Sequence, residues 1–265
     1  NRRMIPEYAI TAWRNIVPWS ASEQVEQDLV ICRALTEIYK DEYLSSHLAF
    51  RGGTALHKLY LSPQPRYSED IDLVQIEPEP IKATIDKIRD VLAFLGEPKV
   101  KQKKHNNTLI FRFDSETIPV VPIRLKVEIN CKEHFNVFGL NKMDFSVQNQ
   151  WYTGSCQVNT YHLDELIGTK LRALYQRRKG RDLFDLYKAI STGSLNTDKV
   201  LECYHKYMEF VVDNPPSQKE FIQNMEIKMQ DDEFLGDTEL LLRPDEKFNP
   251  QEAYEIIKKE LIEKL

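Results

Sequence analysis

The sequence predicts an α+β protein with two parts, a sheet-containing part over residues 1–155 and a helical part over residues 156–265. Apolar and polar residues alternate, as in strands, in short runs between residues 70 and 130. From residue 191 onward, apolar residues recur only at the three- to four-residue spacing of helices. A chain of 265 residues is long enough to bury a core in each part.

The composition is that of an ordinary globular protein, with 42% hydrophobic and 29% charged residues. The net charge of -5 argues against attraction of nucleic acid to the whole surface, although local basic patches could still bind it. No apolar run has the length of a membrane span, and no signal-peptide pattern opens the chain. The four scattered cysteines contain no C-x-x-C pair and suggest reduced thiols. We therefore expect a cytoplasmic protein without a membrane partner.

The first elements are predicted to be helices that serve as scaffold. Residues 6–13 have the pattern of a short helix. Ser20 to Glu23 has the S-x-x-E spacing of a capping box at the start of a long helix. Its apolar stripe includes Val25 and Leu29, and the charged residues between the apolar ones, Glu26 and Arg33 among them, are expected to face outward.

The most informative stretch runs from Phe50 to Ile76. A short apolar run ends at Phe50, the chain turns through Gly52 and Gly53, and a helical pattern begins at Thr54. A loop broken by prolines follows over residues 62–65. A strand-like run, I-D-L-V, then comes directly after a first aspartate.

Asp70 and Asp72 lie two residues apart in this run, so their side chains should stand on the same face of a strand. Two carboxylates held this close repel each other, and a hard divalent cation such as Mg²⁺ removes the conflict. Gly52 and Gly53 have no Cβ, so a phosphate can approach their backbone, and the hydroxyl of Thr54 suits the start of the following helix. Taken alone, a Gly-Gly turn or an acidic D-x-D turn is more often structural than functional.

The next elements are a helix and two strands. An apolar stripe predicts a helix over residues 81–95, and a basic cluster follows it at Lys99, Lys101, Lys103 and Lys104. Residues 108–113 and 123–130 alternate as strands, and Glu128 falls on the polar face of the second. Residues 131–152 are irregular and predict loops with at most one short strand.

A second informative stretch covers residues 161–190. Lys170 lies on the apolar face of a predicted helix, so its ammonium must either find a partner or extend to solvent. After Gly180, Asp182 and Asp185 share one face of the next helix and could pair with neighbouring arginines. The arginines and lysine of residues 177–181 form the most basic part of the chain. No motif is found in the last third, which is helical and charged.

The motif F-R-G-G-T-A-L-H-K-L…R-Y-S-E-D-I-D-L resembles that of the AbiEii/AbiGii toxin family within the nucleotidyltransferase superfamily. Residues 161–190 resemble a later motif of that family, and the whole resemblance covers residues 4–190. It implies a polymerase-β-like nucleotidyltransferase core with a mixed β-sheet, followed by a helical C-terminal lobe. It also implies a toxin of a type IV toxin–antitoxin or phage abortive-infection system that transfers a nucleoside monophosphate from an NTP.

The same resemblance implies roles for particular residues. Asp70, Asp72 and Glu128 would bind Mg²⁺ or Mn²⁺, although many relatives carry Asp at the third position. Phosphate contacts would come from the glycine turn and from both halves of the chain: Gly52, Gly53, Thr54, Ser68, Lys170 and Arg181. Asp182 and Asp185 would be catalytic or orienting acids.

The resemblance further implies that the acceptor is RNA, such as the tRNA 3′ end. It implies a DNA-binding antitoxin from a neighbouring gene that acts indirectly. Two other classes stay open at this point, namely a metal-dependent nuclease and a nucleotide-binding regulator without catalysis. The Gly-Gly-Thr turn argues against the first, since hydrolysis needs no triphosphate cradle, and the intact D-x-D argues against the second.

Overall fold

The computed structural model describes residues 4–265 and divides the chain into two compact units. The first unit ends at Tyr161 and the second runs from His162 to Leu265. The division therefore falls at the end of strand β7, Thr153–Tyr161, whereas the boundary predicted after residue 155 lies inside that strand. Among residues 4–265, no helix combines the length and apolar character needed to cross a lipid bilayer.

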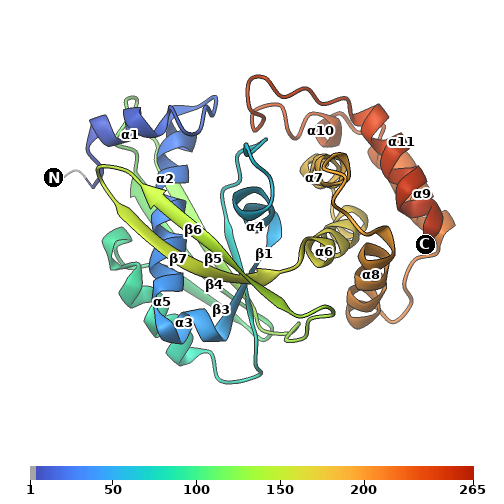
Figure 1. Cartoon of the computed structure of the whole chain (residues 1–265), viewed down its shortest axis with the longest axis horizontal. Coiled ribbons are helices and arrows are strands. Elements are labelled where there is room, and N and C mark those ends of the chain that lie inside the picture. The colour runs from blue at the N-terminus through green and yellow to red at the C-terminus, as the bar shows by residue number, and fades with distance from the viewer. Residues whose placement is uncertain (1–3) are drawn as a thin grey trace. The chain divides into compact units, whose positions relative to one another are not determined.

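The first unit is built around a seven-stranded sheet with the order β3-β4-β5-β2-β1-β7-β6 (Figure 1). The remaining strands are β1 Leu48–Arg51, β2 Ile71–Gln75, β3 Lys99–Lys103, β4 Asn106–Asp114, β5 Pro122–Asn130 and β6 Leu140–Gln148. The pairs β2–β5 and β1–β7 are parallel and the other neighbours are antiparallel. The predicted α+β class with a mixed sheet is confirmed.

The helices of the first unit are α1 Glu7–Trp13, α2 Ser22–Lys40, α3 Glu42–His47, α4 Gly52–Leu59 and α5 Lys82–Val91, with a 3₁₀ turn at Ala93–Leu95. α2 packs along β5, β6 and β7, and α4 packs against β1 and β2. The predicted capping box is wrong by one position, because α2 begins at Ser22. The backbone N–H of Ala21 there donates to the side chain of Gln24 at 3.2 Å.

Two further predictions for this unit are wrong. Glu26 was expected on the outer face of α2 but is fully buried. Its carboxylate can be buried because the backbone N–H groups of Glu116 and Thr117 donate hydrogen bonds to it at 2.9 and 3.3 Å. Residues 131–152 contain β6 and are followed directly by β7, and these strands pair over nine residues each. From Lys142 to Gln148 the sequence K-M-D-F-S-V-Q alternates exposed polar residues with less exposed apolar ones, so the pattern of a half-buried strand was present and the prediction overlooked it.

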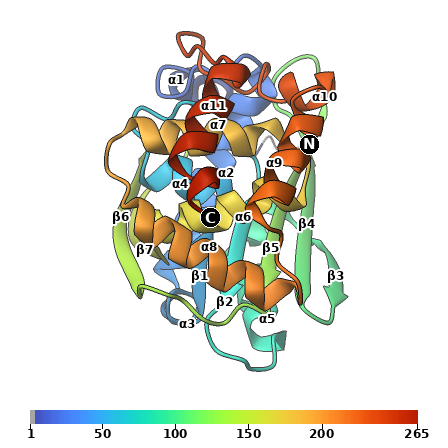
Figure 2. The same ribbon diagram turned by 90° about the vertical axis from the view of Figure 1, so that its right-hand side faces the viewer.

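The second unit is helical, as predicted: α6 Leu163–Gln176, α7 Gly180–Ser191, α8 Thr197–Val211, α9 Gln218–Lys228, α10 Asp232–Leu235, α11 Pro250–Glu260 and a 3₁₀ turn at Ile262–Lys264. α6 packs against α7 and α8, and α11 packs against α7 (Figure 2). Asn249 caps α11 by accepting from the backbone N–H groups of Gln251 and Glu252, with Pro250 at the first helical position.

Candidate functional site

The structure brings the three predicted carboxylates together on one face of the central strands. Asp72 in β2 is the Cα partner of Glu128 in the parallel strand β5, and of Arg51 in the antiparallel strand β1. Asp70 directly precedes β2 and shares the face of Asp72. The i, i+2 spacing of the D-x-D run and the strand register together place three acidic side chains on one patch of the sheet.

The pKa values of Asp70 and Asp72 are both raised in this cluster. Burial, together with the negative charges of Asp70 and Glu128, raises the pKa of Asp72 from 3.8 to about 6. Burial also raises the pKa of Asp70, although the positive charge of Lys126 opposes this rise. Such a cluster of acids is electrostatically unfavourable by itself and attracts a cation.

Lys126 has the largest effect among the positive side chains that oppose the rise in the pKa values of Asp70 and Asp72, ahead of Arg124 and Arg51. Its Nζ lies 3.8 Å from Oδ2 of Asp70 and 3.6 Å from Oε2 of Glu128. Asn106 donates from its side-chain amide to Oε1 of Glu128. Sequence reasoning missed Lys126, although its place two residues before Glu128 on the polar face of the same strand could have indicated it.

The donor set fits a hard divalent cation, because Asp70, Asp72 and Glu128 offer only carboxylate oxygens. Within residues 4–265, however, no three acidic, histidine or cysteine side chains already surround one point as metal ligands. Lys126 stands beside two of the three carboxylates, and the carboxylates repel one another. The role of these residues as metal ligands therefore stays a prediction.

Two features of position 52 require glycine, namely its backbone conformation and the close approach of Asp72. Its φ of +86° lies in the left-handed region that L side chains rarely adopt. A Cβ at this position would lie 2.6 Å from Oδ2 of Asp72. Gly52 is also the first residue of α4, so the backbone at the N-terminus of this helix passes directly beside the acidic cluster. This closeness is the structural reason for glycine in the predicted turn.

Thr54 and Ser68 connect α4 to the start of β2. The two hydroxyl groups lie 2.7 Å apart, and the Thr54 hydroxyl also donates to the backbone carbonyl of Asp70. Thr54 is almost fully buried and Ser68 is largely buried. The two hydroxyl groups therefore hold Asp70 in place relative to the glycine turn, and their predicted contact with phosphate stays untested.

A buried ion pair anchors the other end of α4. Lys58 Nζ lies 2.7 Å from Oδ2 of Asp28, which also accepts hydrogen bonds from the indole N–H groups of Trp13 and Trp19. Asp28 is fully buried in α2. The sequence analysis missed this pair, because the apolar stripe of α2 gave no reason to expect a charge facing the core. It ties α4, and with it the glycine turn, to the first long helix.

In the second unit, the predicted residues form a buried ionic cluster of their own. Lys170 is only 7% exposed, and its Nζ lies 3.0 Å from Oδ2 of Asp185 and 3.3 Å from Oδ1 of Asp182. Both aspartates are fully buried. Lys170 therefore does not extend to solvent, and its two partners come from α7.

The arginines of residues 177–181 are paired with acids of the same unit. Arg177 makes two hydrogen bonds of 2.7 Å to the carboxylate of Asp182. Arg181 makes two to Asp237, at 2.9 and 3.0 Å. Arg178 binds Asp231 at 3.0 Å. Pairing of Asp182 and Asp185 with Arg178 and Arg181 was one possibility at helical spacing, and the structure instead pairs Asp182 with Arg177, which lies five residues before it.

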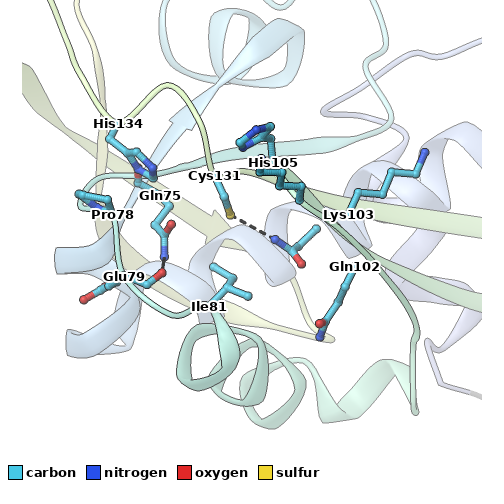
Figure 3. Close-up of a pocket in the computed structure, with 11 residues that line it drawn as sticks. Gln75, Pro78, Glu79, Ile81, Gln102, Lys103, His105, Cys131 and His134 are labelled. Carbon is cyan, nitrogen blue, oxygen red and sulfur yellow. Dashed lines mark hydrogen bonds between the residues drawn. The ribbon is translucent and has the colours of Figure 1, made fainter.

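The first unit also contains an open cavity of about 560 Å³ (Figure 3). The basic cluster predicted after residue 98 contributes Lys103, Lys104 and His105 to its wall. His134 shares a hydrogen bond of 2.8 Å with the backbone carbonyl of Gln75 at another wall. Gln75 lies three residues beyond Asp72 on β2 and on the opposite face of the strand, so this cavity is separate from the acidic cluster.

Comparisons with known proteins agree with this architecture. The family model described as "Nucleotidyl transferase AbiEii toxin, Type IV TA system" matches residues 33–259. The solved structure of MenT4, a nucleotidyltransferase toxin from Mycobacterium tuberculosis H37Rv, is similar at a TM-score of 0.66 and 15% identity, covering 98% of this chain and 90% of MenT4. A solved structure from H. pylori is similar at a TM-score of 0.54 and 14% identity, over 91% of this chain and 93% of that one. No curated protein sequence matches the chain.

Proposed function

The chain belongs to the AbiEii nucleotidyl transferase toxin family of type IV toxin–antitoxin systems, and from this premise we propose that it transfers a nucleoside monophosphate from an NTP to RNA, such as the tRNA 3′ end. Membership of this family makes the protein a nucleotidyltransferase with a nucleotide substrate and an antitoxin counterpart. The RNA acceptor is our proposal. The observation that supports it best is the acidic cluster of Asp70, Asp72 and Glu128 beside the glycine turn.

We propose that the three carboxylates bind Mg²⁺ or Mn²⁺ during transfer. A bound divalent cation would activate the attacking hydroxyl and stabilise the leaving pyrophosphate. The protein prepares this site by holding Asp72 and Glu128 in direct register and by fixing Asp70 through the hydroxyl of Thr54. The raised pKa of Asp72 reflects its burial and the neighbouring negative charges of Asp70 and Glu128, which a cation would neutralise.

The triphosphate is proposed to lie against the start of α4. The absence of side chains at Gly52 and Gly53 leaves the backbone open there, and N–H groups at the start of a helix favour anions. Thr54 and Ser68 support this site by positioning the backbone of Asp70. The roles of Lys170 and Arg181 as phosphate contacts, and of Asp182 and Asp185 as acids, remain predictions carried by the family resemblance.

The decisive experiment measures transfer directly. The protein is incubated with Mg²⁺, total tRNA and each of the four α-labelled NTPs in turn, and the RNA is separated on a denaturing gel. Label in RNA with one NTP, absent with EDTA and absent in Asp72→Asn, is the expected result. Shortened RNA without label would instead indicate a nuclease, and bound NTP without either change would indicate a nucleotide-binding regulator.

The proposed cellular role is that of a toxin in phage abortive infection, opposed indirectly by a DNA-binding antitoxin from a neighbouring gene. The four free cysteines agree with the reducing cytoplasm in which NTPs and tRNA occur. Expression of the wild-type chain should arrest growth of host cells and reduce phage plaques, whereas Asp72→Asn should do neither. Normal growth of cells that contain active, full-length protein would contradict the toxin role.

A further inference from the structure

One face of the sheet beside the acidic cluster is strongly basic. On β3, β4 and β5, every second side chain points away from the apolar core. The basic residues at these outward positions are Lys99, Lys101, Lys103, Arg112, Arg124 and Lys126, here called the basic face. The acidic residues at the outward positions of the same three strands are Asp114 and Glu128. Figure 2 shows the three strands side by side, with β3 at the edge of the sheet.

The register places two of these charges directly against each other. Arg112 of β4 and Arg124 of β5 are Cα partners in the antiparallel pair, and both side chains are exposed. Like charges directly opposite in a sheet are destabilising. Within the described range 4–265 neither guanidinium forms a close ion pair, although the positive charge of Arg124 acts on the carboxyl of Asp70 and opposes the rise in its pKa. The arrangement costs stability in the isolated protein, and a bound polyanion would relieve it.

Protection of a sheet edge explains only part of the basic face. Lysines on an edge strand prevent pairing with other chains, and Lys99, Lys101 and Lys103 on β3 could serve this purpose alone. Arg112 lies two residues beyond Ile110, where the pairing of β4 with β3 ends, so it could also protect an edge. Arg124 is paired with β4, and the side chain of Gln27 donates to its backbone carbonyl, so edge protection gives no reason for an arginine there. A ligand on this face accounts for both groups of residues.

The basic face is continuous with the acidic cluster. Lys126 lies 3.6 Å from Glu128, and its neighbour on the same face of β5 is Arg124, two residues earlier. Across the sheet, Thr108 of β4 separates Glu128 from Lys101 of β3, so Lys101 lies about 10 Å from Glu128 at the usual strand spacing. A chain with one end at the acidic cluster can therefore run over the basic face.

We propose that the basic face binds the phosphate backbone of the RNA acceptor and so guides its reacting end to the acidic cluster. The proposal rests on the proposed function in that the acceptor is RNA. With a net charge of -5, the protein as a whole repels RNA, so attraction must come from a concentrated patch. Phosphate contacts of this kind position a nucleic acid without reading its sequence.

The test compares two double variants that lose the same charge. Arg112→Gln with Arg124→Gln removes the central pair of the basic face. Lys82→Gln with Arg89→Gln is the control on α5, where these residues pair with Asp86 and Glu97. Affinity for total tRNA is measured between 50 and 200 mM salt. Separately, KM values for tRNA and for the NTP donor are measured in the transfer assay.

The basic-face variant should bind tRNA about tenfold more weakly at low salt, and its salt slope should fall by about 1 for each arginine removed. Its KM for tRNA should rise by a larger factor than its KM for NTP, which the loss of Arg124 can affect through Asp70. Its melting temperature should be equal to or above that of the wild type, because a like-charge pair has been removed. The control variant should match the wild type in all of these.

The outcomes separate this proposal from the proposed function. If the wild type labels RNA and the basic-face variant keeps its tRNA affinity and salt slope, the basic face is not the RNA surface, and an acidic protein would be the next polyanion to test. If the wild type labels no RNA, the transfer proposal fails. The measured affinity for tRNA then still tests whether the basic face binds RNA. In that case, weaker tRNA binding by the basic-face variant, but not by the control variant, supports the basic face as the RNA surface. Binding equal to that of the wild type overturns this proposal.

Discussion

Asp72 of β2 and Glu128 of β5 are direct Cα partners across two parallel strands, on the face that also carries Asp70. Cross-strand partners of like charge are destabilising, and burial together with the negative charges of Asp70 and Glu128 raises the pKa of Asp72 to about 6. The charge of Lys126 offsets this repulsion only in part. The acidic cluster therefore lowers the stability of the folded protein, and this loss of stability can be measured.

Replacing Asp72 by Asn should abolish transfer and stabilise the metal-free protein. A carboxyl whose pKa rises from 3.8 to about 6 on folding favours the folded state less once pH exceeds the lower value. The stability difference between variant and wild type should therefore grow from about pH 4 and level off above about pH 6. Discounted for partial exposure, it should reach about 1–2 kcal/mol at neutral pH in EDTA. Thermal melts of both proteins across this range would show it, and a variant less stable than the wild type at pH 7 would contradict it.

Mg²⁺ should stabilise the wild-type protein in the absence of nucleotide. A cation that binds only the folded state at 100 times its Kd adds about 2.7 kcal/mol. The melting temperature should increase with the concentration of Mg²⁺ or Mn²⁺ for the wild type and should stay constant for Asp72→Asn. An equal rise in both proteins would place the bound cation elsewhere.

Replacing Lys126 by Met should make the protein more dependent on added cation. Its ammonium lies 3.8 Å from Asp70 and 3.6 Å from Glu128, so its loss removes the largest internal counter-charge of the acids and leaves the weaker effects of Arg124 and Arg51. We expect a lower melting temperature in EDTA and a larger rise with Mg²⁺ than in the wild type. Lys126→Arg keeps the charge and should behave like the wild type in EDTA. Equal melting of Lys126→Met and wild type in EDTA would refute the counterion role.

Replacing Gly52 by Ala should damage both stability and activity, and a second glycine isolates the cause. Gly52 and Gly139 have φ values of +86° and +84°, but an added Cβ meets Asp72 Oδ2 at 2.6 Å only at the first, with nothing within 4 Å at the second. Each change costs about 1–2 kcal/mol for the backbone conformation. Chemical denaturation should show a larger loss for Gly52→Ala, and transfer should be lost in this variant but kept in Gly139→Ala. Equal losses of stability would mean that Asp72 moves aside without cost.

Replacing Lys170 by Ala should destabilise the second unit. Removal of one partner leaves the fully buried Asp182 and Asp185 without this cation, and breaking a buried pair costs about 3 kcal/mol. Lys264→Ala, which removes an exposed pair with Glu260, should change stability by less than about 1 kcal/mol. Denaturation and transfer should be measured together. Lost transfer at unchanged stability would favour the predicted phosphate contact over a structural role.

Local sequence patterns predicted much of this protein. The apolar alternation of residues 123–130 gave β5 and the outward position of Glu128, because strand geometry assigns faces without knowledge of neighbours. The D-x-D spacing placed Asp70 and Asp72 on one face for the same reason. Patterns failed where one residue's partner lies far along the chain, as with Glu26 and the N–H groups 90 residues away. For β6 the alternation was present over residues 142–148, and the sequence analysis overlooked it.

The sequence by itself determined the α+β class, the glycine turn, the acidic run and the helical character of the second unit, since each depends on neighbours within a few residues. Only the tertiary structure decided which charges meet. The parallel pairing of β2 with β5 sets Glu128 opposite Asp72 and brings Lys126 beside both Asp70 and Glu128. The antiparallel pairing of β4 with β5 sets Arg112 opposite Arg124. A shift of one residue in either register would turn these side chains to the other face, so the chemistry of this site depends on strand pairing that no local pattern encodes.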